Sequence, residues 1–268
     1  MSLKNAKFHQ LAIGGGLLAA ILILLAGVCL TRGISIRVDM DRCVEAPSSQ
    51  YPLGADELGR DLVSSVTVGA GISLLTGLAV VLISAVVGGL LGMIAGLAGG
   101  IIDAVIMRIV DVILSFPGFL LAVSLAAFFT PGILTLILVL TVSGWVGCAR
   151  LVRGEVLKYK QKEFILAARS MNASFFRIVF SHLLPLVLPL IVVQASLDIA
   201  GVVLAESGLN FLGVGLDPEI PSLGQLIDAG RGHLFDNPRL IAVPGLVLFS
   251  IIIAFNFIGE GLRKRLTR

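Results

Sequence analysis

Long apolar runs separated by short polar segments dominate the chain. Five windows contain no Asp, Glu, Lys or Arg, and they cover residues 11–30, 62–102, 112–149, 178–197 and 240–259. A helix that crosses a bilayer needs about 20 apolar residues, so every window is long enough for at least one crossing. Two of them, 62–102 and 112–149, are too long for one ordinary crossing, and their division decides the number of helices.

The window 112–149 divides at Pro131-Gly132, because this pair strongly favours a turn. It predicts crossings near 112–130 and 133–149, with a loop at 103–111 before them. The window 62–102 has no such pair near its middle, and its glycines gather late, where small residues mark close helix packing. We expect one crossing there, with 62–68 in its outer approach and a turn at Gly99-Gly100. The prediction is an all-α, polytopic membrane protein with six transmembrane helices.

Composition and charge agree with a membrane location. Of the 268 residues, 57% are hydrophobic and 14% are charged, whereas soluble domains carry about 25% charged residues. With six crossings, fourteen of the twenty Lys and Arg share a side with both termini, which places both termini in the cytoplasm. A seven-helix topology with a hairpin near Ser84 satisfies the same charge rule, but no turn signal supports it. No A-x-A cleavage site follows the first apolar run, so we interpret it as a retained span.

Other features exclude several classes of protein. Three scattered cysteines imply neither a disulfide framework nor a metal cluster. The formal charge of +3 gives no indication of nucleic-acid binding. The chain has no GxxxxGK[ST], HExxH or GxSxG motif, so we expect no ATP hydrolysis and no active site in it.

A charged, amphipathic insert, EFILAARSMNASFFRIVFSHLLP (residues 163–185), interrupts the apolar pattern. Good helix formers in 161–171 predict a short helix that stops at Asn172, since Asn tolerates the left-handed conformation at a helix end. Ser174 can cap a second helix, and Pro185 kinks or ends it. The pair either lies on the membrane surface or docks on a soluble partner through Phe175, Phe176 and Leu166.

This insert resembles the EAA loop of ABC-importer permeases, EAA-x3-G-x9-I-x-L-P. Leu166-Ala167-Ala168, Asn172 and Leu184-Pro185 stand at the matching positions. The chain departs from that pattern with Leu166 for Glu, Asn172 for Gly and His182 for Ile. Glu163, one helical turn before Leu166, is a candidate substitute for the missing carboxylate on the same face.

Four more segments resemble the peptide/nickel group of these permeases. YPLGADELGRD (51–61) is similar to its PLGTDxLGRD signature, and MRIVD (107–111) with Phe116-Pro117 to its MRxxD…P segment. FLGVG (211–215) with Pro218, Pro221-Ser222 and Gly224 is similar to FLGLGxxPPxPxWG, with Leu223 in place of the aromatic residue. FNFIGEGLR (255–263) is similar to AFNxxGDGLRD. The five ordered motifs identify the chain as a C-type permease subunit of the dipeptide/oligopeptide/nickel ABC importers, the type that pairs with a second, different permease.

The resemblance implies a type I ABC-importer permease fold in a prokaryotic cytoplasmic membrane. It implies an N-terminal part (1–61) with a tail, the first helix and an external loop, and a core domain (62–268) with five helices and coupling helices at 161–184. It also implies two permeases, two ATPase subunits that bind ATP and Mg, and an external substrate-binding protein, with no cofactor in this chain. The coupling residues carried over from the motif and its surroundings are Glu163, Leu166, Ala167, Ala168, Asn172, Ala173, Ser174 and Phe175.

Further candidates come from single polar residues. Asp198, with Gln194 one turn earlier, lies inside a span, where a carboxylate faces protein or a water-filled path. It either meets a cationic substrate, forms an interhelical hydrogen bond or pairs with the partner permease. Asp56, Arg60 and Asp61 form an ion pair, contact the binding protein or belong to a solvated turn held by Gly54 and Gly59. A lone His233 gives little indication of a metal site, and none is predicted.

These observations leave the substrate open between peptides and nickel or metal complexes. The alternative function is a self-sufficient secondary transporter or channel, although no internal repeat supports it. A membrane scaffold or enzyme is disfavoured because the chain lacks catalytic motifs.

Overall fold

The computed structural model describes residues 3–32, 36–49 and 51–266. In these ranges the chain is helical, with one isolated bridge between Ala55 and Asp61. The elements in chain order are α1 (Leu3–Arg32), η1 (Met40–Arg42), α2 (Leu62–Ala98), α3 (Gly100–Leu114), α4 (Gly118–Ala126), α5 (Ile133–Tyr159), α6 (Glu163–Ser170), α7 (Phe175–Arg177), η2 (Ile178–Leu183), α8 (Leu184–Phe211), α9 (Leu223–Ala229), η3 (Gly230–His233) and α10 (Arg239–Leu266).

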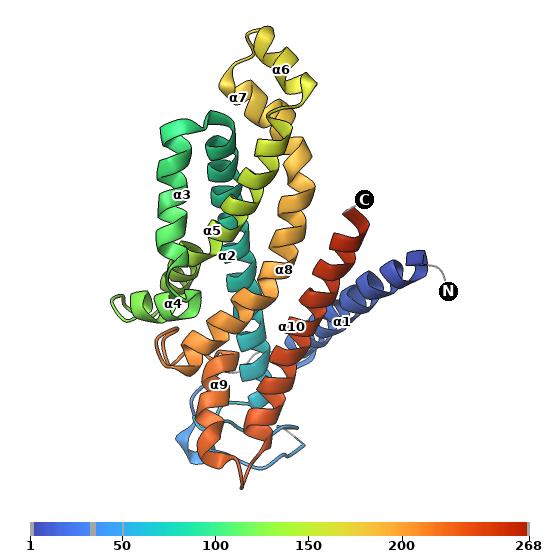
Figure 1. Ribbon diagram of the computed structural model, residues 1–268. Helices are drawn as coiled ribbons and strands as arrows, with labels where there is room; N and C mark the ends of the chain where they lie inside the picture. Colours follow the sequence, from blue (N-terminus) through green and yellow to red (C-terminus); the bar gives the residue numbers. More distant parts are fainter. Residues whose placement is uncertain (1–2, 33–35, 50, 267–268) are drawn as a thin grey trace.

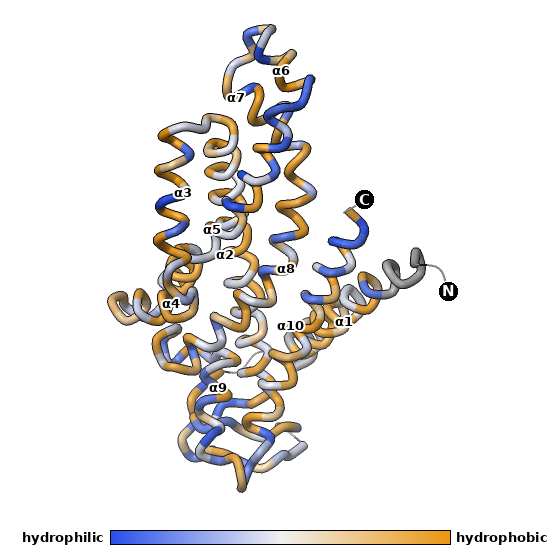
Figure 2. The backbone as a smooth tube through the Cα atoms, viewed as in Figure 1, coloured by the Kyte–Doolittle hydropathy of each residue, from blue (hydrophilic) through white to orange (hydrophobic). Residues whose placement is uncertain are grey.

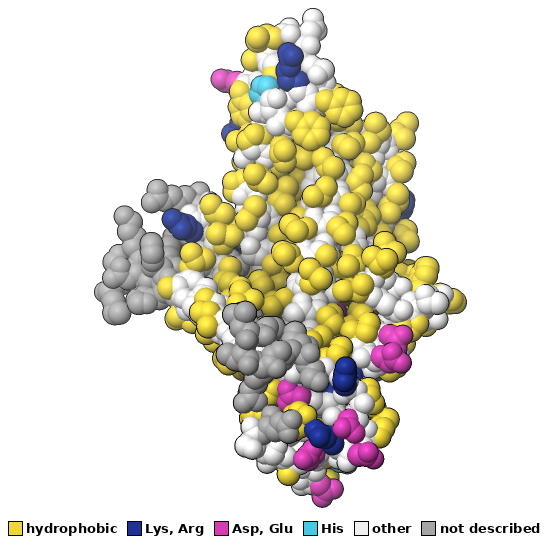
Figure 3. Space-filling model, turned by 180° about the vertical axis from the view of Figure 1, so that it is seen from behind, with side chains coloured by type: hydrophobic (Ala, Val, Ile, Leu, Met, Phe, Trp, Pro, Cys, Tyr) yellow, Lys and Arg dark blue, Asp and Glu magenta, His cyan; other side chains and the backbone are white. Residues whose placement is uncertain are grey.

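The helices form an elongated bundle with a polar end on either side of an apolar middle. In Figure 1, α2, α5 and α8 follow the long axis, and α6 and α7 project beyond one end of it, here named the elbow end. The segment 36–61, α9 and η3 gather at the opposite end, here named the loop end. Hydropathy along the backbone follows this division (Figure 2). Seen from behind, a broad apolar surface covers the middle, and charged side chains gather at the two ends (Figure 3).

Within the described residues, five helices are long and apolar enough to cross a membrane, and the bent pair α3–α4 brings the total to as many as six. The predicted all-α, polytopic fold is therefore confirmed. Helix α2 runs unbroken for 37 residues and ends before Gly99 and Gly100, which both have positive φ (70° and 58°). The single crossing and the Gly99-Gly100 turn are thus as predicted, and the seven-helix alternative is wrong.

The late glycines of α2 allow it to pack closely against α5. Gly88, Gly92 and Gly96 are spaced four residues apart, so they lie on one face of the helix. A Cβ at Gly88 would lie 2.4 Å from the carbonyl oxygen of Trp145, and one at Gly92 would lie 2.5 Å from that of Ala149. The backbones of the two helices therefore approach closely, as small residues permit in membrane helices.

The third crossing differs from the prediction. Residues 103–111 are not a loop but belong to α3, and the expected span at 112–130 is instead split between α3 and α4, which meet at 83°. Pro117 stands at the bend, where its missing N–H prevents continuation of the helix. Both carboxylates of α3 have cationic partners on α5, because Asp103 pairs with Arg153 and Asp111 pairs with Arg150.

The fifth crossing is longer than the apolar window suggested. Helix α8 continues to Phe211, fourteen residues beyond the end of the charge-free window at Leu197, and includes two carboxylates, Asp198 and Glu206. Pro185 does not end the preceding helix but lies in the first turn of α8. The π-helical segment η2 comes before it, and the N–H of Leu184 bonds five residues back to the carbonyl of Val179.

Helix α10 lies beside α1. Helix α10 also contacts α8, and α1 contacts α2. A Cβ at Gly14 of α1 would lie 2.8 Å from the carbonyl oxygen of Ala254, and one at Gly261 of α10 would lie 2.9 Å from the backbone nitrogen of Leu11. The termini emerge on the same side of the bundle, in the direction of the elbow end (Figure 1).

Candidate functional site

The projecting elbow is made by a complete Schellman turn at the end of α6. The N–H of Asn172 bonds to the carbonyl of Arg169, and the N–H of Ala173 bonds to that of Ala168, both at 3.0 Å. These are the two bonds that define this helix ending. Asn172 has φ 55°, in the left-handed region, so the predicted stop and its cause are confirmed.

The second half of the elbow also follows the prediction. The hydroxyl of Ser174 accepts a hydrogen bond from the backbone N–H of Arg177 at 3.3 Å, which caps α7. From α7 the chain continues through η2 into α8 without an interruption, so the elbow is directly joined to a membrane-spanning helix.

The two faces of the elbow differ in burial. Ile165 and Ala168 are buried against Val152, Val156 and η2, which fixes α6 on the bundle. Glu163, Leu166, Ala167, Asn172, Ser174 and Phe175 are exposed, and Ala173 is half-buried. Met171 and Phe176 project apolar side chains that are 81% and 69% exposed. Of the eight predicted coupling residues, Ala168 therefore holds the helix in place, while most of the others face outward.

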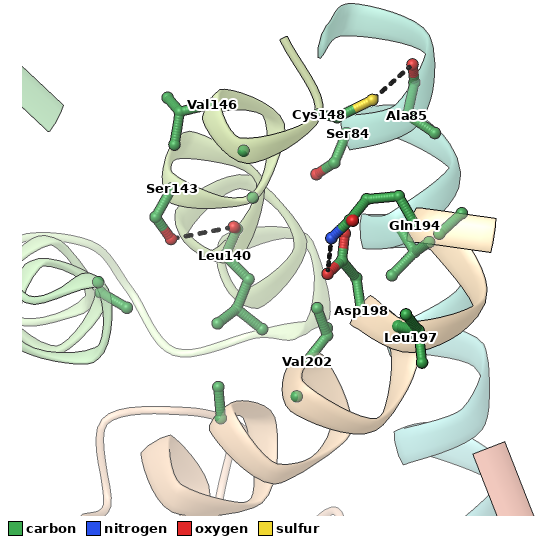
Figure 4. Close-up of a pocket in the computed structure, with 18 of the residues that line it drawn as sticks. Ser84, Ala85, Leu140, Ser143, Val146, Cys148, Gln194, Leu197, Asp198 and Val202 are labelled. Atoms are coloured by element: carbon green, nitrogen blue, oxygen red, sulfur yellow. Dashed lines mark hydrogen bonds between the residues drawn. The ribbon is translucent and has the colours of Figure 1, made fainter. Parts of the chain in front are cut away.

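A cavity of about 390 Å³ lies between α2, α4, α5 and α8 in the apolar middle of the bundle. Asp198 and Gln194 of α8 both line it, and the side-chain amide of Gln194 donates to the Asp198 carboxylate at 2.8 Å (Figure 4). This bond stays within one helix, so the interhelical hydrogen bond considered for Asp198 is not present in the described chain. Ser84 of α2, Ser143 and Cys148 of α5 also line the cavity.

A second carboxylate of α8, Glu206, was not among the residues predicted from the sequence. It is fully buried and accepts hydrogen bonds from the hydroxyls of Ser73 (2.7 Å) and Ser207 (3.2 Å) and from the Asn210 amide. The side-chain carbonyl oxygen of Asn210 accepts a hydrogen bond from the backbone N–H of Leu216 at 2.7 Å, which connects the segment after α8 to the helix. The sequence does contain one indication of this group, because the polar residues Glu206 and Asn210 are four positions apart and so lie on one face of a helix.

The residues predicted near the external surface are buried at the loop end. Asp56 and Arg60 are 3% and 5% exposed and form an ion pair at 2.8 Å. Asp61 accepts the N–H of Ser64 at 3.0 Å and caps α2. The ion pair is as foreseen, but the interpretation as a solvated turn is wrong. Packing against Glu219 and Ser65 explains why, because Arg60 donates to the Glu219 carbonyl and Ser65 to the Asp56 carboxylate.

His233 lies 3.4 Å from a carboxylate oxygen of Glu57. In the described ranges, His, Cys, Asp and Glu side chains form no group of three that could hold a metal ion.

Comparisons with known proteins agree with this arrangement. Residues 88–268 match the family described as "Binding-protein-dependent transport system inner membrane component". The glutathione transport system permease protein GsiD of Salmonella typhimurium is 41% identical over 257 residues, which are 96% of this chain and 85% of that protein. GsiD of Pectobacterium atrosepticum is 37% identical over 228 residues, with coverage of 85% and 76%. The MetNI methionine ABC transporter, solved in inward-facing conformations, shares the fold with a TM-score of 0.60 at 24% identity, covering 75% of this chain and 95% of its own.

Proposed function

Because this chain belongs to the family of binding-protein-dependent transport system inner membrane components, and is a permease subunit of an ABC importer of the peptide and nickel group, we propose that it imports short peptides. The likeness to the GsiD relatives, which bear the name of glutathione transport, supports a small peptide as cargo over nickel or a metal complex. The permease forms the pathway with a second, different permease. An external binding protein delivers the peptide.

The elbow, residues 163–177 with α6 and α7, is the proposed docking element for an ATPase subunit. The observation that carries this assignment is the exposure of apolar side chains on a projecting, rigidly capped turn, with Met171 and Phe176 the most exposed. An apolar surface outside the membrane-spanning bundle is typical of an interaction site. The elbow also continues directly into α8, so a displacement of the docked subunit reaches a membrane-spanning helix.

The remaining assignments follow from this orientation. The elbow end and both termini face the cytoplasm, and the loop end faces the binding protein. The chain is non-catalytic, with ATP and Mg²⁺ bound by the partner subunits. The loop-end group of Asp56, Arg60 and Asp61 supports the surface on which the binding protein docks rather than touching it, since these side chains are buried. The cavity beside Asp198 and Gln194 is part of the translocation path.

Transport by the assembled complex tests the function. We expect ATP-dependent uptake of glutathione or trialanine in liposomes that contain both permeases, the ATPase subunits and the loaded binding protein. Uptake by this chain without ATPase subunits would instead support a self-sufficient transporter or channel and would refute the proposal.

A surface substitution tests the docking element. Phe176→Asp places a charge on the apolar surface of the elbow, and we expect the ATPase subunits to co-purify at least tenfold less well. The matched control is Phe235→Asp at the loop end, where Phe235 is 95% exposed, and it should leave co-purification unchanged. Normal ATPase recovery with Phe176→Asp would contradict the assignment of the elbow.

A further inference from the structure

The cavity beside α8 holds a carboxylate that lacks a cationic neighbour. Asp198 lines the cavity, and no Lys, Arg or His is among the described residues that line it. An ionisable side chain inside a membrane span is costly and is normally compensated by a partner or by a passing ion. The hydrogen bond from Gln194 supplies one neutral donor but no positive charge. Within the described chain this carboxylate therefore has no positive charge beside it.

A second polar group in the same cavity also lacks a partner. Ser84 of α2 is 6% exposed, and within the described chain its hydroxyl has no hydrogen-bond partner. Leaving a buried hydroxyl unsatisfied costs about 1–3 kcal/mol, so a ligand that bonds to it is favoured. Ser143, on the facing helix α5, has its hydroxyl donating to the carbonyl of Leu140, so its donor is already satisfied. Figure 4 shows Ser84, Gln194 and Asp198 around the space between α5 and α8.

These groups have the chemistry of an ammonium site. The Gln194 amide nitrogen is committed to Asp198, which leaves its carbonyl oxygen free to accept. The second carboxylate oxygen of Asp198 and the hydroxyl of Ser84 are further acceptors in the same cavity. A primary ammonium group carries one positive charge and three N–H donors. It therefore satisfies both the charge and the unpaired acceptors.

We propose that Asp198, Gln194 and Ser84 bind the ammonium group of the imported peptide within the membrane cavity. This inference deepens the import function proposed above and rests on it. The cavity volume of about 390 Å³ falls in the range of small-molecule sites, roughly 300–1,000 Å³. The rest of the lining is predominantly apolar and accepts peptide side chains without selecting among them. The site thus favours a free amine, either an N-terminus or a lysine side chain.

Direct binding tests the proposal. The intact complex of permeases and ATPase subunits, in lipid nanodiscs without binding protein, is titrated with alaninamide and with N-acetylalaninamide. We expect saturable binding of the free amine only. Asp198→Asn should weaken it by about 10- to 100-fold, the range for a hydrogen bond to a charged group, and Asp198→Glu should restore part of the loss. Ser84→Ala should weaken it several-fold, whereas the control Ser250→Ala, on α10 outside the cavity lining, should not. Lysinamide with an acetylated α-amine tests whether a lysine side chain can replace the N-terminus as the source of the amine. Its side-chain amine alone should be enough for binding.

Uptake by the complete importer separates this inference from the proposed function. Equal binding of the free and the acetylated amide, absence of binding, or binding unchanged by Asp198→Asn would each overturn the ammonium site. If the wild-type complex still imports peptides in those cases, the import function stands and Asp198 pairs with a residue of the second permease. If the wild-type complex imports no peptide, the proposed function itself fails.

Discussion

Substitution of Asn172 tests whether the elbow conformation governs coupling. Asn172 holds the left-handed conformation with φ 55°, which costs a residue with a Cβ roughly 1–2 kcal/mol and a β-branched residue more. The two Schellman hydrogen bonds at the elbow contribute about 1 kcal/mol each. The added strain of Asn172→Val is thus similar in size to what these bonds supply. We expect the elbow of the variant to be only about half-populated.

The opposite change serves as the control. Asn172→Gly removes the strain while keeping both backbone N–H donors, so the elbow should form at least as well as in the wild type. The measurement is the number of ATP molecules hydrolysed per peptide imported by the complete complex in liposomes. Asn172→Val should raise this number several-fold, because α6 is no longer held at a fixed angle to α7, whereas Asn172→Gly should not.

A melting curve of the purified complex distinguishes local from global effects. Ile165 and Ala168 belong to a buried cluster with residues of α5 and η2. This cluster should keep α6 on the bundle while its angle to α7 loosens, so the variant should retain its main thermal transition. A Val variant with normal coupling and normal stability would refute the claim that the left-handed turn is needed for coupling.

Two further predictions concern the bundle and the loop end. Gly92→Val should lower the melting temperature and cost about 1–3 kcal/mol in stability, because its Cβ would lie 2.5 Å from the Ala149 carbonyl oxygen. The control is Gly71→Val on the same helix, which should be tolerated because a Cβ there meets nothing within 4 Å. Equal melting temperatures of the two variants would contradict the packing argument. Arg60→Met should cost about 3–5 kcal/mol because it leaves the buried Asp56 carboxylate unpaired, whereas Lys158→Met, which removes an exposed pair, should cost under about 1 kcal/mol in the same melting assay.

The local features of the sequence predicted the structure well. The Gly99-Gly100 turn, the stop at Asn172 and the cap at Ser174 each depend on the backbone preference of one or two residues, and all three are present. Such preferences act within a few residues, so they can be identified without knowledge of the fold.

The charge-free windows predicted the helix boundaries less well where those boundaries depend on partners distant in sequence. The charges in residues 103–111 favour a loop in the sequence pattern, yet Arg153, about fifty residues away, neutralises Asp103 within the bundle. In the same way α8 extends past Asp198 to Phe211 because Ser73 of α2 and Asn210 satisfy Glu206. A window that ends at each charged residue cannot represent these pairings, which exist only after the helices pack.

The length of α8 gives the two candidate regions a common element. The helical segment from Phe175 to Phe211 begins at the elbow, passes the cavity at Asp198, and ends beside the loop-end segment that Asn210 holds. Glu206 is fully buried, so its end of the helix is fixed against α2 by hydrogen bonds that are costly to break. The wider π-helical turns of η2 lie between the elbow and the cavity, at the one stretch of this segment with a different helical repeat. A displacement of the elbow would therefore have to pass through η2 to reach the cavity, and the hydrogen bonds of Glu206 would oppose its passage to the loop end of α8. This ordering places the π-helical turns of η2 between the proposed docking element and the proposed ammonium site.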